Sequence, residues 1–75
     1  MITKAQKSFL INLSIDQMTG FLVEDFKLDI PSALNIIYNS DVFSLLKEET
    51  NGLYSESPSY IYELLKKEYF KAALQ

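Results

Sequence analysis

The spacing of apolar residues in the first third of the chain constrains the fold most strongly. They recur at steps of three and four residues, at Ile11, Ile15, Met18, Leu22 and Phe26. This period is typical of one face of an α-helix and differs from the alternation of a strand. Thr3, with Gln6 three residues later, offers a capping box at the start. The pattern predicts a helix over about residues 3–26.

Three further apolar residues, Leu10, Leu13 and Phe21, widen the predicted buried face of this helix. Gly20 lies inside the helix, where glycine costs about 1 kcal/mol relative to alanine. We interpret Gly20 as a place where another helix approaches closely, in preference to a hinge.

Two short helices are predicted in the middle of the chain. Asp29 can cap a helix, and Pro31 is tolerated in a first helical turn, so the second helix starts there. Its apolar side is formed by Ala33, Leu34, Ile37 and Tyr38. The helix is short because residues 39–41, Asn-Ser-Asp, compete for its backbone hydrogen bonds.

The third helix is predicted to begin at a cap formed by Ser40 or Asp41. Its buried positions are Val42, Phe43, Leu45 and Leu46. Asn51-Gly52 is expected to end it, because glycine adopts the left-handed conformation that closes many helices.

Ser57-Pro58 gives the clearest start signal, a hydroxyl cap followed by proline at the first helical position. The last helix is predicted to run to about Ala73. One stripe along it contains Ile61, Leu64, Leu65, Glu68 and Ala72, and the glutamate is its one polar member. On its exposed face, Glu63 with Lys67 and Glu68 with Lys71 stand at spacings that favour ion pairs.

The chain is therefore predicted to be all-α, a compact bundle of about four helices, with the first and last long and the middle two short. Its 75 residues suffice for one hydrophobic core, so residues 1–75 are expected to form a single helical domain. Such a core yields only a few kcal/mol of net stability, and there is no cysteine to form a disulfide. This favours stabilisation by self-association or by a protein partner.

The composition removes most of the side chains that enzymes use. Histidine, cysteine and arginine are absent, whereas catalysis relies mostly on histidine, cysteine or a serine beside a base. Two groups of carboxylates remain, Glu24-Asp25 with Asp29 and Glu48-Glu49 with Glu56. Adjacent helical residues point in different directions, so neither group converges by spacing alone. We therefore expect no enzyme activity, no catalytic residue, no cofactor and no metal site.

The charge and hydropathy of the chain bear on its partners and its location. Seven lysines against ten carboxylates give a net charge of −3, which argues against nucleic-acid binding. No stretch approaches the roughly 20 apolar residues that cross a bilayer. We expect no membrane association and a cytoplasmic location.

Tyrosines are the best candidates for a contact surface, because they combine rigid apolar area with a hydroxyl that tolerates water. The candidate interaction surface consists of Tyr54, Tyr60, Tyr62 and Tyr69. Tyr60 and Tyr62 stand two residues apart on the predicted helix, so one of them should be exposed. The alternative is that the tyrosines line the edge of the core.

Two segments, Gly52-Leu53-Tyr54-Ser55 and Ser57-Pro58-Ser59-Tyr60-Ile61, resemble a family of small all-helical bacterial proteins of unknown function from gut anaerobes. Further positions that fit are Ala33, Leu34, Tyr38, Ser40 and Leu45, so the resemblance covers most of the chain. Some similar families are encoded beside predicted toxins. The resemblance thus implies an accessory or antitoxin-like role.

The preferred hypothesis is a protein-interaction module, homodimeric, that uses the last helix and the tyrosines around residues 54–62. The alternative is a nucleic-acid-linked transcriptional regulator, in which the two short helices form a helix-turn-helix-like pair. Such a pair needs cations on its second helix, but residues 41–49 offer only Lys47. A carboxylate-dependent enzyme or metal binder is the third hypothesis, and it predicts a bound divalent ion.

Overall fold

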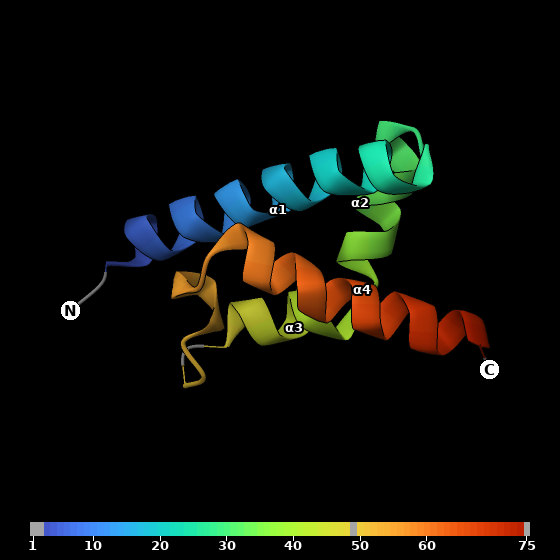
Figure 1. Ribbon diagram of the computed structural model, residues 1–75. Coiled ribbons are helices and arrows are strands. Elements are labelled where there is room, and N and C mark those ends of the chain that lie inside the picture. Colours follow the sequence, from blue (N-terminus) through green and yellow to red (C-terminus); the bar gives the residue numbers. More distant parts are fainter. Residues whose placement is uncertain (1–2, 49, 75) are drawn as a thin grey trace.

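The computed structural model describes residues 3–48 and 50–74, with the side chains of the last helix described as far as Lys71. Glu49 and the side chain of Ala72 lie outside this part. The elements are α1 (Lys4–Phe26), α2 (Ile30–Tyr38), α3 (Asp41–Lys47), the 3-10 helix η1 (Leu53–Ser55) and α4 (Pro58–Leu74) (Figure 1). The predicted all-α fold, with two long outer helices and two short middle ones, is confirmed for the described residues.

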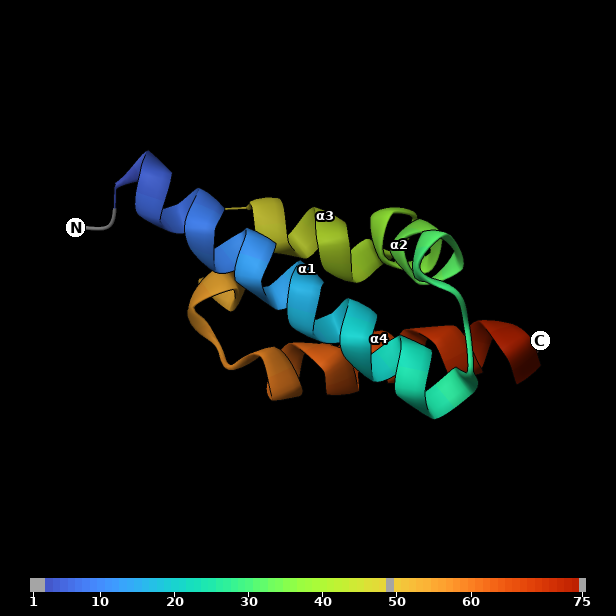
Figure 2. The same ribbon diagram turned by 90° about the horizontal axis from the view of Figure 1, so that it is seen from above.

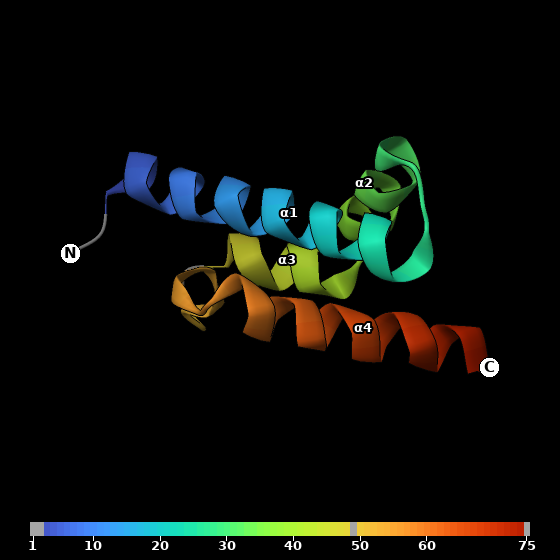
Figure 3. The same cartoon turned by 45° about the horizontal axis from the view of Figure 1, so that its top comes forward.

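The two long helices lie side by side and run in the same direction, while α3 runs the opposite way beside α4 (Figures 1 and 3). Helix α2 crosses the C-terminal end of α1. Seen from above, the first turn of α1 projects beyond η1 (Figure 2). The molecule is elongated, with extents of 39 × 23 × 18 Å, and α1 forms one of its long sides.

The core is built where the predicted apolar faces of the helices meet. Its fully buried side chains are Met18 and Leu22 of α1, Ala33 and Ile37 of α2, Leu46 of α3, and Ile61 and Leu65 of α4. Each large side chain of this kind stabilises the fold by about 1.5–3 kcal/mol through removal from water. Helix α1 supplies the central row, with α2, η1 and α4 packed against it, while α3 packs on α4, η1 and α2.

Every predicted helix start is capped by a predicted side chain. The capping residues are Thr3, Asp29, Ser40 and Ser57, and their oxygens accept backbone N–H groups three residues on, at 3.1, 2.9, 3.1 and 3.2 Å. Gln6 completes the capping box by accepting the backbone N–H of Thr3 at 2.8 Å. These contacts satisfy N–H groups that a helix start leaves without partners.

The predicted end of the third helix is wrong. Helix α3 stops at Lys47, and Glu48 already has an extended backbone, with φ −76° and ψ 139°. The side-chain amide of Asn51 donates to the carbonyl of Leu45 at 3.1 Å and so satisfies a terminal group of the helix. Gly52 does adopt the left-handed conformation, with φ 67°, but it stands just before η1 and does not close α3.

Three residues of the predicted apolar faces are exposed, among them Leu45, which was predicted to be buried. Leu13, Tyr38 and Leu45 retain 39%, 51% and 41% of their accessible surface. Tyr38 covers part of its ring by an edge-on contact with Phe43, with 5.0 Å between the ring centroids. The periodicity gives the width of an apolar face, but the neighbouring elements decide how much of that width is covered.

Gly20 does not mark a close approach between helices of this chain. Among the described residues, no heavy atom beyond the backbone of its own helix and its chain neighbours lies within 4 Å of where its Cβ would stand. The residue is exposed on the side of α1 that faces away from the core. The conformational cost of glycine at this position is therefore not offset by packing inside the chain.

Replacing Gly20 with alanine should therefore stabilise the fold. We expect Gly20→Ala to raise the free energy of unfolding by about 0.5–1 kcal/mol, because alanine restricts the unfolded chain and meets no obstacle in the helix. Urea unfolding followed by circular dichroism measures the change. A loss of stability would show that the methyl group meets a neighbour, contrary to the open space around Gly20.

Candidate functional site

The four tyrosines of the predicted interaction surface lie at separate places. Tyr54 is half-buried in η1, where the Lys7 ammonium lies 5.3 Å from its ring centroid. Tyr60, near the start of α4, is 50% exposed, whereas Tyr62 is buried in the core, so the prediction that one of them is exposed is confirmed. Tyr69 is half-buried, and the centroid of its ring lies 5.5 Å from that of the Phe26 ring. The structure therefore does not bring the four together on one surface.

Tyr62 links α4 to α1 through a partly buried polar contact. Its hydroxyl donates to a carboxylate oxygen of Asp25 at 2.6 Å, and the centroid of its ring lies 4.9 Å from that of the Phe21 ring. Burial, and next the hydrogen bond to Asp25, raise the pKa of Tyr62 above its usual value of 10.0. This arrangement keeps the phenol neutral and gives it a role in holding the helices together.

Tyr62→Phe is expected to lower the free energy of unfolding by about 1 kcal/mol at neutral pH, through loss of this hydrogen bond. Because the pKa of Tyr62 is raised in the folded chain, the unfolded chain loses the proton first as the pH rises. The stability that Tyr62 contributes is therefore complete below about pH 10 and declines above it. Urea titrations at neutral and alkaline pH should show a smaller decline for Tyr62→Phe than for wild type or Tyr60→Phe. Equal declines would contradict the assignment.

Glu68, the polar member of the α4 stripe, caps the start of α3 from a distance of 27 residues in the sequence. Its two carboxylate oxygens accept the backbone N–H groups of Asp41 at 2.8 Å and Val42 at 3.1 Å. Ser40 accepts the next one, from Phe43. The positive end of the α3 dipole thus already faces a carboxylate. This disfavours the helix-turn-helix hypothesis, which needs that end of the second helix to meet DNA.

The three carboxylates of the first predicted group, Glu24, Asp25 and Asp29, have different surroundings. Asp29 caps α2, where hydrogen bonds from the side chain and backbone of Ser32 lower its pKa. Asp25 accepts the Tyr62 hydroxyl, and Glu24 is exposed on the outer side of α1. No three histidine, cysteine, aspartate or glutamate side chains of the described chain gather in a way that could hold a metal ion. Over the same residues, no helix is long and apolar enough to span a bilayer.

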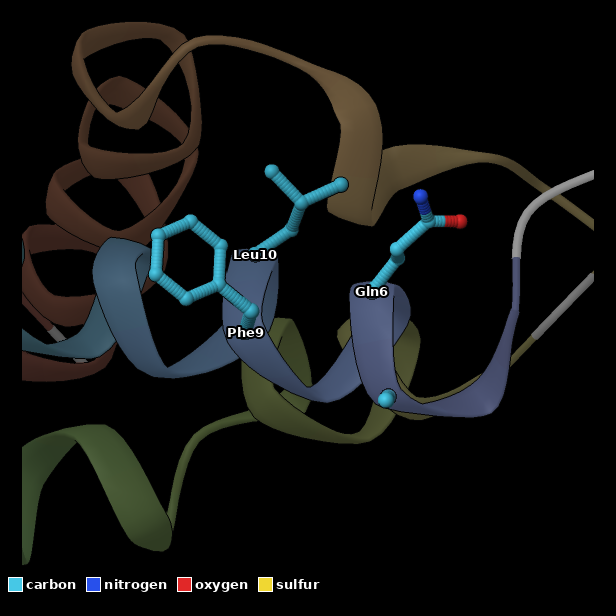
Figure 4. A pocket seen from close by; sticks show the side chains of 4 residues that line it. Gln6, Phe9 and Leu10 are labelled. Atoms are coloured by element: carbon cyan, nitrogen blue, oxygen red, sulfur yellow. The ribbon is translucent and has the colours of Figure 1, made fainter.

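The most prominent exposed apolar surface lies on the outer side of α1, the side that faces away from the core. Phe9 is 66% exposed, the highest value among the large apolar side chains of the described chain, and Leu13 is 39% exposed. The two stand one helical turn apart and so lie on the same face. An open groove of about 550 Å³ adjoins them, lined by Ala5, Gln6, Phe9 and Leu10 (Figure 4).

A second hollow lies farther along the same side of α1. It has a volume of about 240 Å³ and is lined by Asp16, Gln17, Gly20, Phe21 and Glu24. One of the lining residues, Gly20, carries no side chain. We call the exposed residues from Ala5 to Glu24, with the groove and the hollow, the outer face of α1.

Sequence reasoning did not single out Phe9, although a signal for its exposure was present. Phe9 precedes Met18 by nine residues, which is two and a half helical turns, so the two must point to opposite sides of one helix. Because Met18 belongs to the long apolar row, Phe9 has to face away from the core. Gly20 follows Phe9 by eleven residues, close to three turns, and so shares its side.

Comparison of the chain with protein families, with curated proteins and with solved structures finds no match.

Proposed function

We propose that this protein is a protein-interaction module whose contact surface is the outer face of α1. The observation that carries the proposal is the exposure of Phe9, 66%, one turn from the exposed Leu13 and beside an open groove. Adjacent exposed apolar side chains on one helix face are typical of a binding surface, and aromatic residues dominate the energetics of such contacts.

The other exposed apolar residues support this choice of surface. Ile30, Leu45 and Tyr60 lie singly on three different helices. Tyr38 packs against Phe43, and Phe70 packs against Phe26 with ring centroids 5.4 Å apart. Single exposed apolar residues are common on soluble proteins and need no partner. The outer face of α1 therefore replaces the tyrosines around residues 54–62 in the proposal.

The composition of the chain and its family resemblance agree with the proposal. A module that acts by contact agrees with the absence of histidine, cysteine and arginine and with carboxylates that already serve as helix caps or accept hydrogen bonds. It also suits the accessory or antitoxin-like role that the resemblance to a bacterial family implies, and the cytoplasmic location expected from the sequence.

The test compares Phe9→Ser with Tyr60→Ser, which removes an exposed aromatic from another helix and serves as the control. Each chain is immobilised and exposed to a native bacterial lysate, and its sedimentation is measured in parallel. We expect the wild type and Tyr60→Ser to associate with a partner or with themselves, and Phe9→Ser to lose this association. If Tyr60→Ser loses it and Phe9→Ser keeps it, the surface lies on α4 and the proposal is wrong.

A further inference from the structure

We propose that the outer face of α1 binds the same face of a second copy of this chain. The two helices run antiparallel, and Phe9 of each copy enters the hollow around Gly20 of the other. This inference rests on the proposed function, since it names the partner of that surface. The shape of the hollow, its distance from Phe9 and the charges along α1 carry it.

The hollow has the form of a socket for a side chain of a facing helix. Four of its lining residues, at positions 17, 20, 21 and 24, stand at spacings of three, four and seven residues from the first. This is the four-residue hole into which a side chain of a packed helix inserts. Gly20 leaves the centre of the hole open, because no described atom outside its own helix backbone and its chain neighbours lies within 4 Å of its missing Cβ position.

The distance between Phe9 and the hollow allows both to be used in one symmetric contact. Phe9 precedes Gly20 by eleven residues, which is close to three turns and about 16 Å along the helix. A two-fold axis near residue 15 therefore sets each Phe9 over Gly20 of the other copy, with Leu13 near the axis. Such a contact is self-complementary, as a symmetric dimer requires. A parallel pair would instead set Phe9 against Phe9 and leave the two hollows facing each other.

The charges along α1 favour the same orientation. The charged side chains of the outer face are Asp16 and Glu24, whereas Lys7 and Asp25 lie on the other side of α1, where Lys7 donates to the carbonyl of Lys47 and Asp25 accepts a hydrogen bond from Tyr62. Antiparallel pairing sets Glu24 of one copy opposite Ala5 of the other, whereas parallel pairing would set Glu24 opposite Glu24 and Asp16 opposite Asp16. The two Asp16 side chains, each exposed in the single chain, are the one like-charge pair that the antiparallel contact brings together.

The size of the face is sufficient for a specific contact. From Ala5 to Glu24 the helix is about 30 Å long, which suits the smaller specific interfaces, of about 1,000 Å² in total. Each copy would contribute about a tenth of its 5159 Å² of accessible surface. The contact would also remove Phe9 from water, which favours the folded state of a domain with a small core.

The first experiment measures self-association by sedimentation velocity over a concentration series. We expect a reversible wild-type dimer, and a dissociation constant raised at least roughly tenfold by Phe9→Ser and by Gly20→Gln. Gly20→Gln fills the hollow but should raise the melting temperature of the monomer, because glutamine favours an exposed helix. Loss of contact is thereby separated from loss of fold. A monomeric wild type, or a Gly20→Gln dimer as tight as that of wild type, would overturn the inference.

The second experiment determines the orientation by disulfide cross-linking, which a chain without cysteine makes simple. In the antiparallel pair the two copies of residue 16 lie about 4 Å apart along the helix axis, whereas those of residue 5 lie about 29 Å apart. Under mild oxidation, Asp16→Cys should form a covalent dimer, and Ala5→Cys should not. Covalent dimers of both variants would indicate a parallel pair and overturn the proposed geometry.

The outcomes also separate this inference from the proposed function. A monomeric wild type that still captures a different protein through Phe9 would overturn the second-copy partner and leave the proposed function intact. A chain that neither dimerises nor captures a partner through Phe9 would overturn both. Phe9-dependent binding to vesicles of anionic phospholipid, without dimerisation, would also overturn both.

Discussion

Leu46→Ala is expected to destabilise the fold by about 2–5 kcal/mol, the range for leucine-to-alanine changes in a packed core. Leu46 lies in α3 with no exposed surface and belongs to the single cluster that joins all four helices. A chain of this size has only a few kcal/mol of net stability, so the variant should be largely unfolded at room temperature. Urea unfolding followed by circular dichroism measures the loss.

The neighbouring Leu45 provides the matched control for this substitution. It is also a leucine of α3, but 41% of its surface is exposed. Leu45→Ala should therefore cost about 1 kcal/mol or less. If the two substitutions cost the same, α3 would have to pack on the core through a different face from the one described.

Glu68→Ala is expected to cost about 2 kcal/mol, because two charge-assisted hydrogen bonds at the start of α3 are lost together. Glu68→Gln should cost about half as much, since its amide keeps one oxygen that can accept a backbone N–H. Amide hydrogen exchange should be faster at Asp41 and Val42, whose N–H groups lose their acceptor.

Glu63 is the control for Glu68 on the same helix. It is exposed, and its carboxylate lies 3.0 Å from the ammonium of Lys66, one turn away. Exposed ion pairs of this kind contribute about 0–1 kcal/mol, so Glu63→Gln should change the free energy of unfolding only slightly. A larger effect for Glu63 than for Glu68 would contradict the role of Glu68 as a cap.

The sequence predicts well those features of the fold that depend on near neighbours. The caps at Thr3, Asp29, Ser40 and Ser57 each act on a backbone group three residues away, so the residue types alone identify them. The end of α3 was misplaced although the residues are local. The side chain of Asn51 donates to a carbonyl at the end of α3, where closure by Gly52 was expected, and Gly52 instead precedes η1.

Contacts between segments that are far apart in the sequence could not be predicted from it. Glu68 stood out as the polar member of an apolar stripe, but its partner at the start of α3, 27 residues earlier, could not be identified from the sequence. Tyr62 and Asp25 are 37 residues apart, so only the packing of α4 on α1 brings them together. The candidate site depends likewise on packing, because coverage of one side of α1 leaves Phe9 and Gly20 on the other.

We propose that the outer face of α1 is the surface through which this protein makes contact. Amide NMR spectra of the labelled chain, recorded over a concentration series, show which residues take part in that contact. We expect shift changes or line broadening along α1 at Phe9, Leu13 and Gly20, with little change around Tyr60, and loss of the effect in Phe9→Ser. Changes confined to α3 or to the start of α4, with α1 unaffected, would contradict the claim.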